Sequence, residues 1–92
     1  MRVIDLANTT ETGNQAAKSL SSQTGRDEAL LQIEFATTGS ATVEGRIDSS
    51  LSFITIAGPY TSDTIVPIAF VPEMRLAISA NGSGIVAKVA VS

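Results

Sequence analysis

The chain has 92 residues, no cysteine, no histidine and a net charge of −3. Without cysteine and histidine it lacks the usual ligands of zinc, haem and iron–sulfur clusters, as well as the Ser-His-Asp and Cys-His catalytic sets. No basic run and no interleaving of basic and aromatic residues occurs, which argues against binding to DNA or RNA. We therefore expect one small domain that is not an enzyme and uses no cofactor, no metal and no small-molecule substrate.

Hydrophobic residues make up 43% of the chain and charged residues only 16%, and the mean hydropathy is +0.26. A domain of this size removes only about 60 to 65% of its unfolded surface from water, so its core is thin. Small domains usually compensate with disulfides, a metal or association with other subunits, and the composition leaves only association. We therefore expect the chain to form homo-oligomers or to bind other proteins.

The hydropathy pattern also predicts where the protein is made. No apolar stretch of signal-peptide length follows Arg2, and no apolar run approaches the roughly 18 residues of a membrane-spanning helix. We expect synthesis in the cytoplasm, no signal peptide and no contact with a membrane.

Residues 1–28 are polar and irregular, and we interpret them as an N-terminal arm or edge segment. Within this arm, Ala16–Leu20 predicts a short strand, although one helical turn fits so short a run as well. The glycine and threonine residues of Asn8–Gln15 predict a loop. Residues 1–28 are thus expected to differ in character from the rest of the chain.

The one compact apolar group of the arm lies in Arg2, Val3, Ile4, Asp5 and Leu6. The alternation of these residues suits addition of a strand to the exposed sheet edge of a partner, where main-chain hydrogen bonds provide affinity. The five residues are therefore the candidate partner-binding site. On sequence alone, an ordinary first strand of the same domain explains the pattern equally well.

Residues 29–92 have the regular pattern of a β-sandwich. Apolar and polar residues alternate in runs of strand length, and turn residues separate the runs. The spacing predicts an all-β fold, an antiparallel two-sheet β-sandwich that is jelly-roll-like and has about six to eight strands. The predicted strands are Ala29–Thr37, Thr42–Asp48, Leu51–Ala57, Asp63–Val71, Met74–Ala80 and Ile85–Val91.

Three local features refine these strands. Pro67 has no backbone N–H, so we place its strand at the edge of a sheet. Gly45 predicts a bulge or the close approach of a large side chain, for which Phe53 is the candidate. Gly58-Pro59 is expected to end the third strand, and Asn81–Gly84 to close a hairpin between the last two strands.

The apolar face of each predicted strand defines the expected core. Ala80 is also expected to face inward, at the end of its strand. The expected core comprises Leu31, Ile33, Phe35, Val43, Ile47, Phe53, Ile56, Ile68, Leu76, Ile78, Ile85 and Val89.

The acidic residues give no strong catalytic or metal site. Glu44 and Asp48 share one strand face, as a glycosidase pair would, but so small a domain has no room for a deep substrate cleft. Asp27-Glu28, Asp63 and Glu73 could suggest calcium, yet neither an EF-hand nor a repeated Asp-x-Asp spacing occurs. We interpret these acids as solvated strand and turn residues.

Two further motifs have simple explanations. Gly82-Ser83-Gly84 resembles a phosphate-binding loop, but no lysine or helix follows, so a turn explains it. The glycosylation triplets Asn8-Thr9-Thr10 and Asn81-Gly82-Ser83 occur without an export signal. Cross-strand ion pairs, each worth up to about 1 kcal/mol, are expected among Glu34, Glu44, Arg46, Arg75 and Lys88.

Three segments of residues 29–92 share a pattern with a known group of proteins. Glu44-Gly45-Arg46-Ile47-Asp48 is a strand that ends in an acidic turn, and Phe53-Ile54-Thr55-Ile56-Ala57 is a following strand with a large aromatic residue. Val71-Pro72-Glu73-Met74-Arg75-Leu76 is a Pro-x-x-Arg entry to the last hairpin. In this pattern the chain resembles small bacteriophage virion β-sandwich proteins, many of which have tryptophan in place of Phe53. Residues 1–28 carry no matching motif.

The resemblance implies a structural role in a virion. The first expectation is a capsid decoration or cement protein, or a head-fibre protein, that binds the exterior of the shell and itself. A tail or head–tail accessory protein is a second possibility. The implied partner is the major capsid protein or another virion protein, and the implied location is the capsid surface.

A small carbohydrate-binding module is the competing function. β-Sandwiches commonly carry sugar sites on a face or a loop rim, and such sites rely on exposed aromatic rings that stack on the sugar. Tyr60, next to Gly58-Pro59, is the candidate ligand platform for this alternative.

Overall fold

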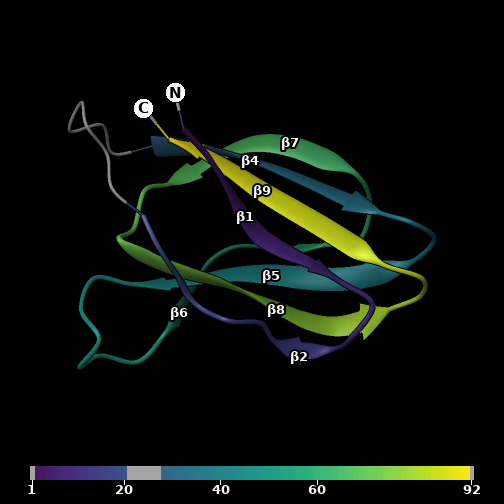
Figure 1. The fold of residues 1–92 in the computed structure, drawn as a ribbon, viewed down its shortest axis with the longest axis horizontal. Helices are drawn as coiled ribbons and strands as arrows, with labels where there is room; N and C mark the ends of the chain where they lie inside the picture. Colours follow the sequence, from purple (N-terminus) through teal and green to yellow (C-terminus); the bar gives the residue numbers. More distant parts are fainter. Residues whose placement is uncertain (1, 21–27, 92) are drawn as a thin grey trace.

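The computed structural model describes residues 2–20 and 28–91, and every regular element in these ranges is a β-strand (Figure 1). No part of the described chain forms a helix long and apolar enough to cross a membrane. The strands are β1 (Arg2–Thr9), β2 (Gly13–Asn14), β3 (Lys18–Ser19), β4 (Glu28–Phe35), β5 (Gly39–Arg46), β6 (Ile54–Tyr60), β7 (Thr64–Ala69), β8 (Glu73–Asn81) and β9 (Ile85–Val91).

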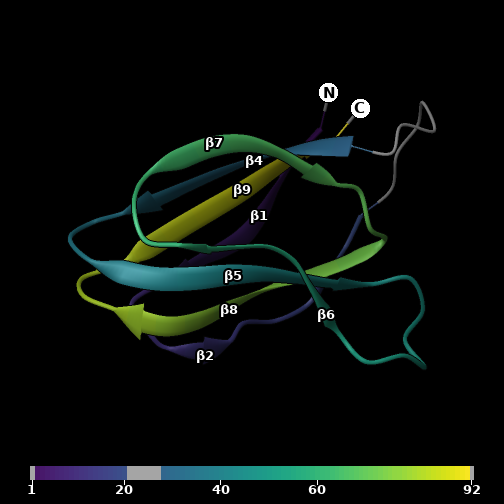
Figure 2. The same ribbon diagram turned by 180° about the vertical axis from the view of Figure 1, so that it is seen from behind.

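The strands form two antiparallel sheets that pack face to face. The strand order is β1-β9-β4-β7 in sheet A and β2-β8-β5-β6 in sheet B, where β3 also pairs with β8. Figures 1 and 2 show the two layers from opposite sides, with β4, β7 and β9 toward the top and β2, β5 and β8 below. The predicted antiparallel two-sheet β-sandwich is confirmed.

The pairing follows a nested order. Both β2 and β3 pair with β8, in nearly continuous register, so they are two pieces of one edge strand. Counted in this way, β1 pairs with β9, β2 and β3 with β8, β4 with β7, and β5 with β6. Successive pairs lie alternately in sheet A and sheet B. This strand order is that of a jelly roll, in which a long hairpin wraps around itself.

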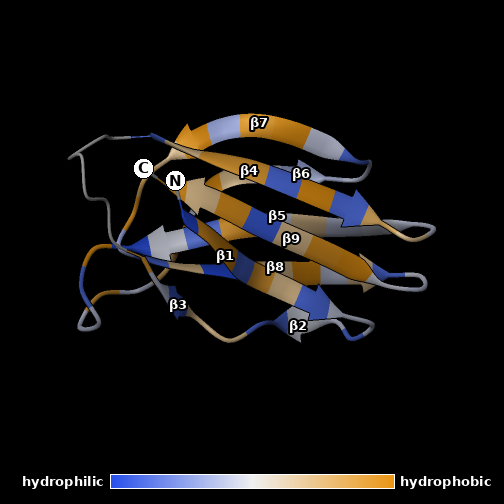
Figure 3. Ribbon diagram, turned by 45° about the horizontal axis from the view of Figure 1, so that its top comes forward, coloured by the Kyte–Doolittle hydropathy of each residue, from blue (hydrophilic) through white to orange (hydrophobic). Residues whose placement is uncertain are grey.

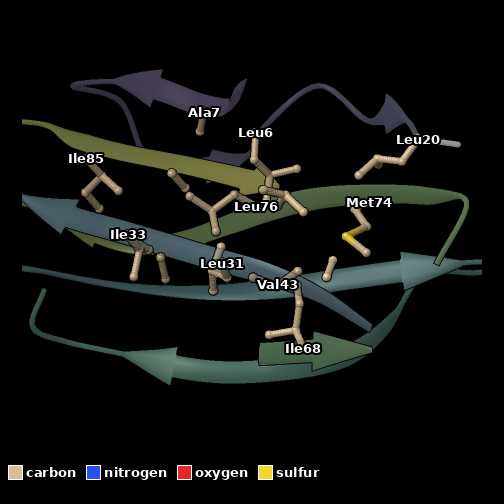
Figure 4. Packing of buried hydrophobic residues seen from close by; sticks show 14 of the residues in the cluster. Leu6, Ala7, Leu20, Leu31, Ile33, Val43, Ile68, Met74, Leu76 and Ile85 are labelled. Carbon is tan, nitrogen blue, oxygen red and sulfur yellow. The ribbon is translucent and has the colours of Figure 1, made fainter. Parts of the chain in front are cut away.

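Alternation along the strands places the core between the sheets. Hydrophobic and hydrophilic residues follow one another along β1, β4 and β9 (Figure 3). In β4, for example, Leu31 and Ile33 are buried whereas Leu30 and Gln32 are exposed. Buried side chains from both sheets meet in the middle (Figure 4). The largest fully buried ones are Leu6, Leu31, Ile33, Met74, Leu76, Ile85, Val43 and Val89.

Most of the predicted core is confirmed. Phe35 and Ile56 are half-buried and packed against the core. The buried members of the predicted set are Leu31, Ile33, Val43, Ile68, Leu76, Ile78, Ile85 and Val89.

Three inward-facing predictions are wrong. Ile47 follows the last residue of β5 and is 73% exposed, because beyond the strand the alternation no longer places side chains over the core. Phe53 precedes β6 and does not belong to the core cluster. Ala80 is exposed because a register shift pairs it with Ser40, which faces away from the core.

The N-terminal segment is part of the sandwich. β1 pairs with β9 from its first residue to its last, with a bulge at Leu6, which is buried. Of the two alternatives for Arg2–Leu6, the structure therefore shows the first strand of the same domain. The predicted short strand within Ala16–Leu20 is confirmed at Lys18–Ser19, whereas the expected loop Asn8–Gln15 contains the end of β1 and all of β2.

The predicted hairpin at Asn81–Gly84 is wrong. β8 lies in sheet B and β9 lies in sheet A, so the connection crosses from one sheet to the other. Both edges of β8 are already occupied, by β5 on one side and by β2 and β3 on the other, which leaves β9 no place beside it. The Gly82 N–H donates to the carbonyl of Thr38 at 2.8 Å, and this bond holds the crossing against the β4–β5 turn.

Two edge strands contain proline. Pro67 lies in β7, the outer strand of sheet A, as predicted from its missing N–H. β5 and β6 form a hairpin, and β6 continues through Gly58-Pro59 to Tyr60. The expectation that Gly58-Pro59 ends the strand is wrong because β6 is the outer strand of sheet B, where a proline costs no ladder bond.

Gly45 lies where the backbone of β5 is closely approached by another segment. A Cβ at this position would lie 3.0 Å from Cγ1 of Val71 and 3.3 Å from the carbonyl oxygen of Glu73. The predicted close approach is confirmed, but Val71 and not Phe53 covers the glycine.

Candidate interaction surface

The outer face of sheet B carries a compact charged cluster. The order Glu-x-Arg occurs twice, as Glu44 and Arg46 on β5 and as Glu73 and Arg75 on β8. Because β5 and β8 are antiparallel neighbours, each glutamate faces an arginine across the strands. Arg75 Nε donates to Glu44 Oε1 at 2.8 Å, and Arg46 Nη2 donates to Glu73 Oε1 at 3.3 Å. All four side chains are about three-quarters buried, so solvent screens these pairs less than fully exposed ones.

The ring of Phe53 lies against both guanidinium groups. Cζ of Arg75 is 4.0 Å and Cζ of Arg46 is 4.2 Å from the centroid of the ring. Arg46 Nη1 also donates to the carbonyl of Leu51 at 3.1 Å, which ties the β5–β6 loop to the sheet. A guanidinium over an aromatic face contributes about 0.5–1 kcal/mol at an exposed site and more when it is desolvated. Side-chain contacts, and not strand pairing, therefore hold residues 47–53 against sheet B.

Three exposed aliphatic side chains adjoin this cluster. Ile47, Leu51 and Ile54 are 73%, 51% and 69% exposed, and each is adjacent in sequence to a cluster residue or bonded to one. Exposed aliphatic groups beside arginine and an aromatic ring have the composition of protein–protein contact sites. We call Glu44, Arg46, Phe53, Glu73 and Arg75, together with Ile47, Leu51 and Ile54, the hairpin surface.

The β5–β6 loop contains a carboxylate that is held in its charged form. Ser50 Oγ donates to Asp48 Oδ2 at 2.5 Å, and the Leu51 N–H donates to the Asp48 carbonyl at 3.0 Å. The Ser50 hydroxyl holds the pKa of Asp48 below its usual 3.8, with a smaller effect from Arg46. Glu44 is occupied by Arg75. Asp48 thus does not resemble the protonated carboxyl that a glycosidase uses as its general acid.

The five candidate partner-binding residues all lie on β1 and face in two directions. They are Arg2, Val3, Ile4, Asp5 and Leu6. Leu6 is buried and Ile4 is half-buried against the core, whereas Val3 and Asp5 are exposed. Asp5 Oδ1 lies 3.3 Å from Lys88 Nζ on β9. β1 is the outer strand of sheet A, so addition of a partner strand at its far edge stays a prediction.

Tyr60, the candidate sugar platform, is half-buried and packs against the core. The three phenylalanine rings are half-buried too, so the described residues contain no fully exposed aromatic platform. This arrangement does not favour the carbohydrate-binding alternative.

The residues considered for calcium lie apart. Glu28 begins β4, Asp63 Oδ1 accepts the N–H of Phe35 at 2.8 Å, and Glu73 is paired with Arg46. Asp27 lies outside the described residues. Within residues 2–20 and 28–91, no three acidic side chains gather in a way that could hold a metal ion.

A hollow of about 650 Å³ opens at one end of the sandwich, where the loops after β1, β4, β6 and β8 meet. Polar groups such as Glu11, Glu34 and Asp63 line it, with Phe35 at its side. Its carboxylates come from separate segments and are exposed to water, and the described residues that line it form no group that could hold a metal ion.

Comparisons with protein-family models, with curated proteins and with solved structures find no match. The function is therefore inferred from the geometry of the hairpin surface and from the sequence resemblance of its three segments. Each of these segments contributes to the surface: 44–48 through β5 and the loop, 53–57 through Phe53 and β6, and 71–76 through β8.

The predicted ion pairs are confirmed in part. Glu44 does pair with Arg75, but Arg46 pairs with Glu73 and Lys88 with Asp5, and neither Glu73 nor Asp5 was among the predicted partners. The repeated Glu-x-Arg order was the signal for the first two pairs, because antiparallel strands with the same order of charges match opposite charges twice. No comparable signal marks the contact of Phe53 with both arginines.

Proposed function

We propose that the chain is a non-catalytic structural protein of a bacteriophage virion, which decorates the capsid by binding the exterior of the shell through its hairpin surface and by contacting other copies of itself. One observation carries this proposal. Segments 44–48 and 53–57, on which the virion resemblance rests, are joined by the β5–β6 loop, and the third segment, 71–76, lies farther along the chain yet meets them in one surface formed by β5, β6 and β8.

The fold is compatible with this role. Jelly rolls are common among viral capsid domains, although lectins and other proteins use them too, so the fold supports the role without specifying it. The sandwich measures about 36 × 28 × 17 Å, which makes it a flat plate with two broad outer faces. A protein of this shape can lie flat on a shell and still contact neighbouring copies of itself.

The chemistry of the hairpin surface suits protein binding. The carboxylates of Glu44 and Glu73 neutralise the two arginines, so a partner can cover the cluster without burying an unpaired charge. Ile47 and Ile54 supply apolar area that water covers in the free protein. Burial of such side chains contributes about 25 cal/mol per Å² before the costs of association are subtracted.

Co-sedimentation with emptied capsid shells of the phage that encodes the chain tests the proposal. The wild-type protein is expected to pellet with the shells saturably, at a fixed number of copies per shell. Ile54→Lys places a charge within the contact and is expected to weaken binding at least about tenfold, which corresponds to about 1.4 kcal/mol. Its matched control, Leu30→Lys, adds the same charge on sheet A and is expected to leave shell affinity at low occupancy unchanged.

Circular dichroism and thermal unfolding should show that both variants keep the fold, since the two replaced side chains are exposed. Saturable binding to isolated tails but not to shells would replace the decoration role with that of a tail accessory protein. Absence of saturable binding by the wild-type chain, or equal binding by Ile54→Lys, would refute the proposed role of the hairpin surface.

A further inference from the structure

The outer face of sheet A carries an apolar row that crosses all four strands. The register places Val3 of β1 opposite Ala90 of β9, Ala90 opposite Leu30 of β4, and Leu30 opposite Pro67 of β7. Directly opposite residues in antiparallel strands point to the same side of the sheet. Val3 and Leu30 are 59% and 44% exposed, so the row faces water and not the core.

The next row along the strands is polar over most of its length. It contains Asp5, Lys88 and Gln32, with the exposed Ile65 at the β7 end. Asp5 and Lys88 form an ion pair, so this row brings no net charge to the face. Farther along β4, Glu34 accepts a hydrogen bond from the side-chain amide of Gln32 at 2.9 Å.

We infer that this face binds the same face of a second copy of the chain. The inference deepens the proposed function, in which copies contact one another, by naming the surface that they use. A twofold axis parallel to the strands, between β9 and β4, lays the apolar row on itself in reverse order. Val3 then lies over Pro67 of the second copy, and Leu30 lies over Ala90 of the second copy.

The same operation brings Lys88 to polar groups of the second copy and sets Asp5 over its Ile65, at the rim of the face. Lys88 comes to lie over Gln32 of the second copy and one row from its Glu34, so an ammonium group meets an amide and a carboxylate. This contact offsets part of the repulsion between two copies that each carry a net charge of −3. Self-complementarity of this kind is what a twofold interface requires.

The area of this face indicates a weak contact. With strands about 4.8 Å apart and about 3.3 Å per residue, four strands of six to eight residues cover a flat area of roughly 450 Å². Two such faces total roughly 900 Å², close to the roughly 1,000 Å² that a specific interface needs. We therefore expect a weak dimer in solution, which the high local concentration on a shell would favour.

Light scattering coupled to size-exclusion chromatography, and sedimentation equilibrium, test the inference over loading concentrations from about 1 μM to about 1 mM. The wild-type chain should shift with concentration from the 9.5 kDa monomer to twice that mass. Leu30→Lys places a charge at the centre of the apolar row and should raise the dissociation constant at least about tenfold. Val3→Lys, at the end of the row and more exposed, is a second variant should Leu30→Lys destabilise the fold.

Ile54→Lys, on the hairpin surface, is the matched control and should dimerise as the wild type does. A wild type that stays monomeric throughout would overturn the inference, and so would a dimer that both Leu30→Lys and Val3→Lys leave intact. Equal loss of the dimer in Ile54→Lys would assign the contact to another surface. Shell binding is measured separately from dimerisation. A chain that binds shells but stays monomeric would refute the dimer and leave shell binding through the hairpin surface intact. A chain that dimerises but does not bind shells would refute shell binding and leave the dimer intact.

Discussion

The two outer faces of the sandwich are built from the same strand alternation but differ in chemistry. On sheet B, the outward positions of β5 and β8 carry glutamate and arginine, which pair with each other and hold Phe53. On sheet A, one outward row carries Val3, Leu30 and Pro67, which have no cover. The core fixes which residues face outward, whereas the outward residues themselves determine what each face can bind.

The largest expected effect on stability comes from truncating a core side chain, compared with truncating its neighbour on the outer face of sheet A. Leu31 is fully buried and its neighbour Leu30 is partly exposed on the opposite side of β4. Leu31→Ala should lower the free energy of unfolding by about 3–5 kcal/mol, because it leaves a cavity between the sheets. Leu30→Ala should cost less than about 1 kcal/mol. Urea unfolding at low protein concentration measures both, and equal costs would mean that the facing of β4 is wrong.

A smaller effect is expected where Val71 approaches the backbone of sheet B. In Gly45→Ala the new methyl group would lie 3.0 Å from Val71 Cγ1, so we expect a loss of about 1–2 kcal/mol from overpacking. The same change made in a Val71→Ala background should cost less, because Cγ1 is gone and only the Cβ of residue 71, at 3.1 Å, remains near the new methyl group. A loss that is equal in both backgrounds would show that Val71 Cγ1 is not the obstacle.

Phe53 distinguishes a surface contact from a core contact. Phe53→Ala removes the ring that both arginines contact, so we expect a loss of about 1–2 kcal/mol in unfolding free energy. The same truncation of a phenylalanine in the core would cost about 3–5 kcal/mol. A loss of that size in Phe53→Ala would place the ring in the core, as the sequence pattern had suggested. Thermal or urea unfolding decides between the two.

The smallest expected effect concerns acid stability in the β5–β6 loop. The pKa of Asp48 is lowered in the fold, so its contribution to stability is fully present above the usual pKa of 3.8. That contribution is lost as the pH falls below this value and through the lowered pKa. NMR titration should show that the Asp48 carboxyl is protonated at a lower pH in the wild type than in Ser50→Ala, which lacks the donor hydroxyl. Equal titration curves would exclude this role of Ser50.

The sequence predicted the fold where strand alternation alone decides the facing of side chains. Leu31 and Ile33, or Ile85 and Val89, are two or four residues apart on uninterrupted strands, so their burial follows from the pleat. Ile47 and Ala80 failed because a strand end and a register shift break the alternation at those positions. No residue type in the sequence signals either this strand end or this register shift.

The topology and the hairpin surface depend on contacts between distant segments. The turn residues Asn81–Gly84 showed that the chain reverses, but they could not show that both edges of β8 were already occupied. The repeated Glu-x-Arg order could have predicted the paired charges, once β5 and β8 were known to be neighbours. The meeting of Phe53 with both arginines could not be predicted, because the loop that carries it has no periodic pattern.

Hydrogen exchange of the shell-bound protein tests the role of the hairpin surface most directly. Residues 47–53 lie outside the strands, so most of their amides exchange quickly in the free chain. Bound to shells, these amides should exchange at least about tenfold more slowly, whereas those of the connection at 82–84, on the crossing from β8 to β9, should be unchanged. Unchanged exchange in residues 47–53 of a chain that is bound and protected elsewhere would contradict the assignment of this surface to the shell.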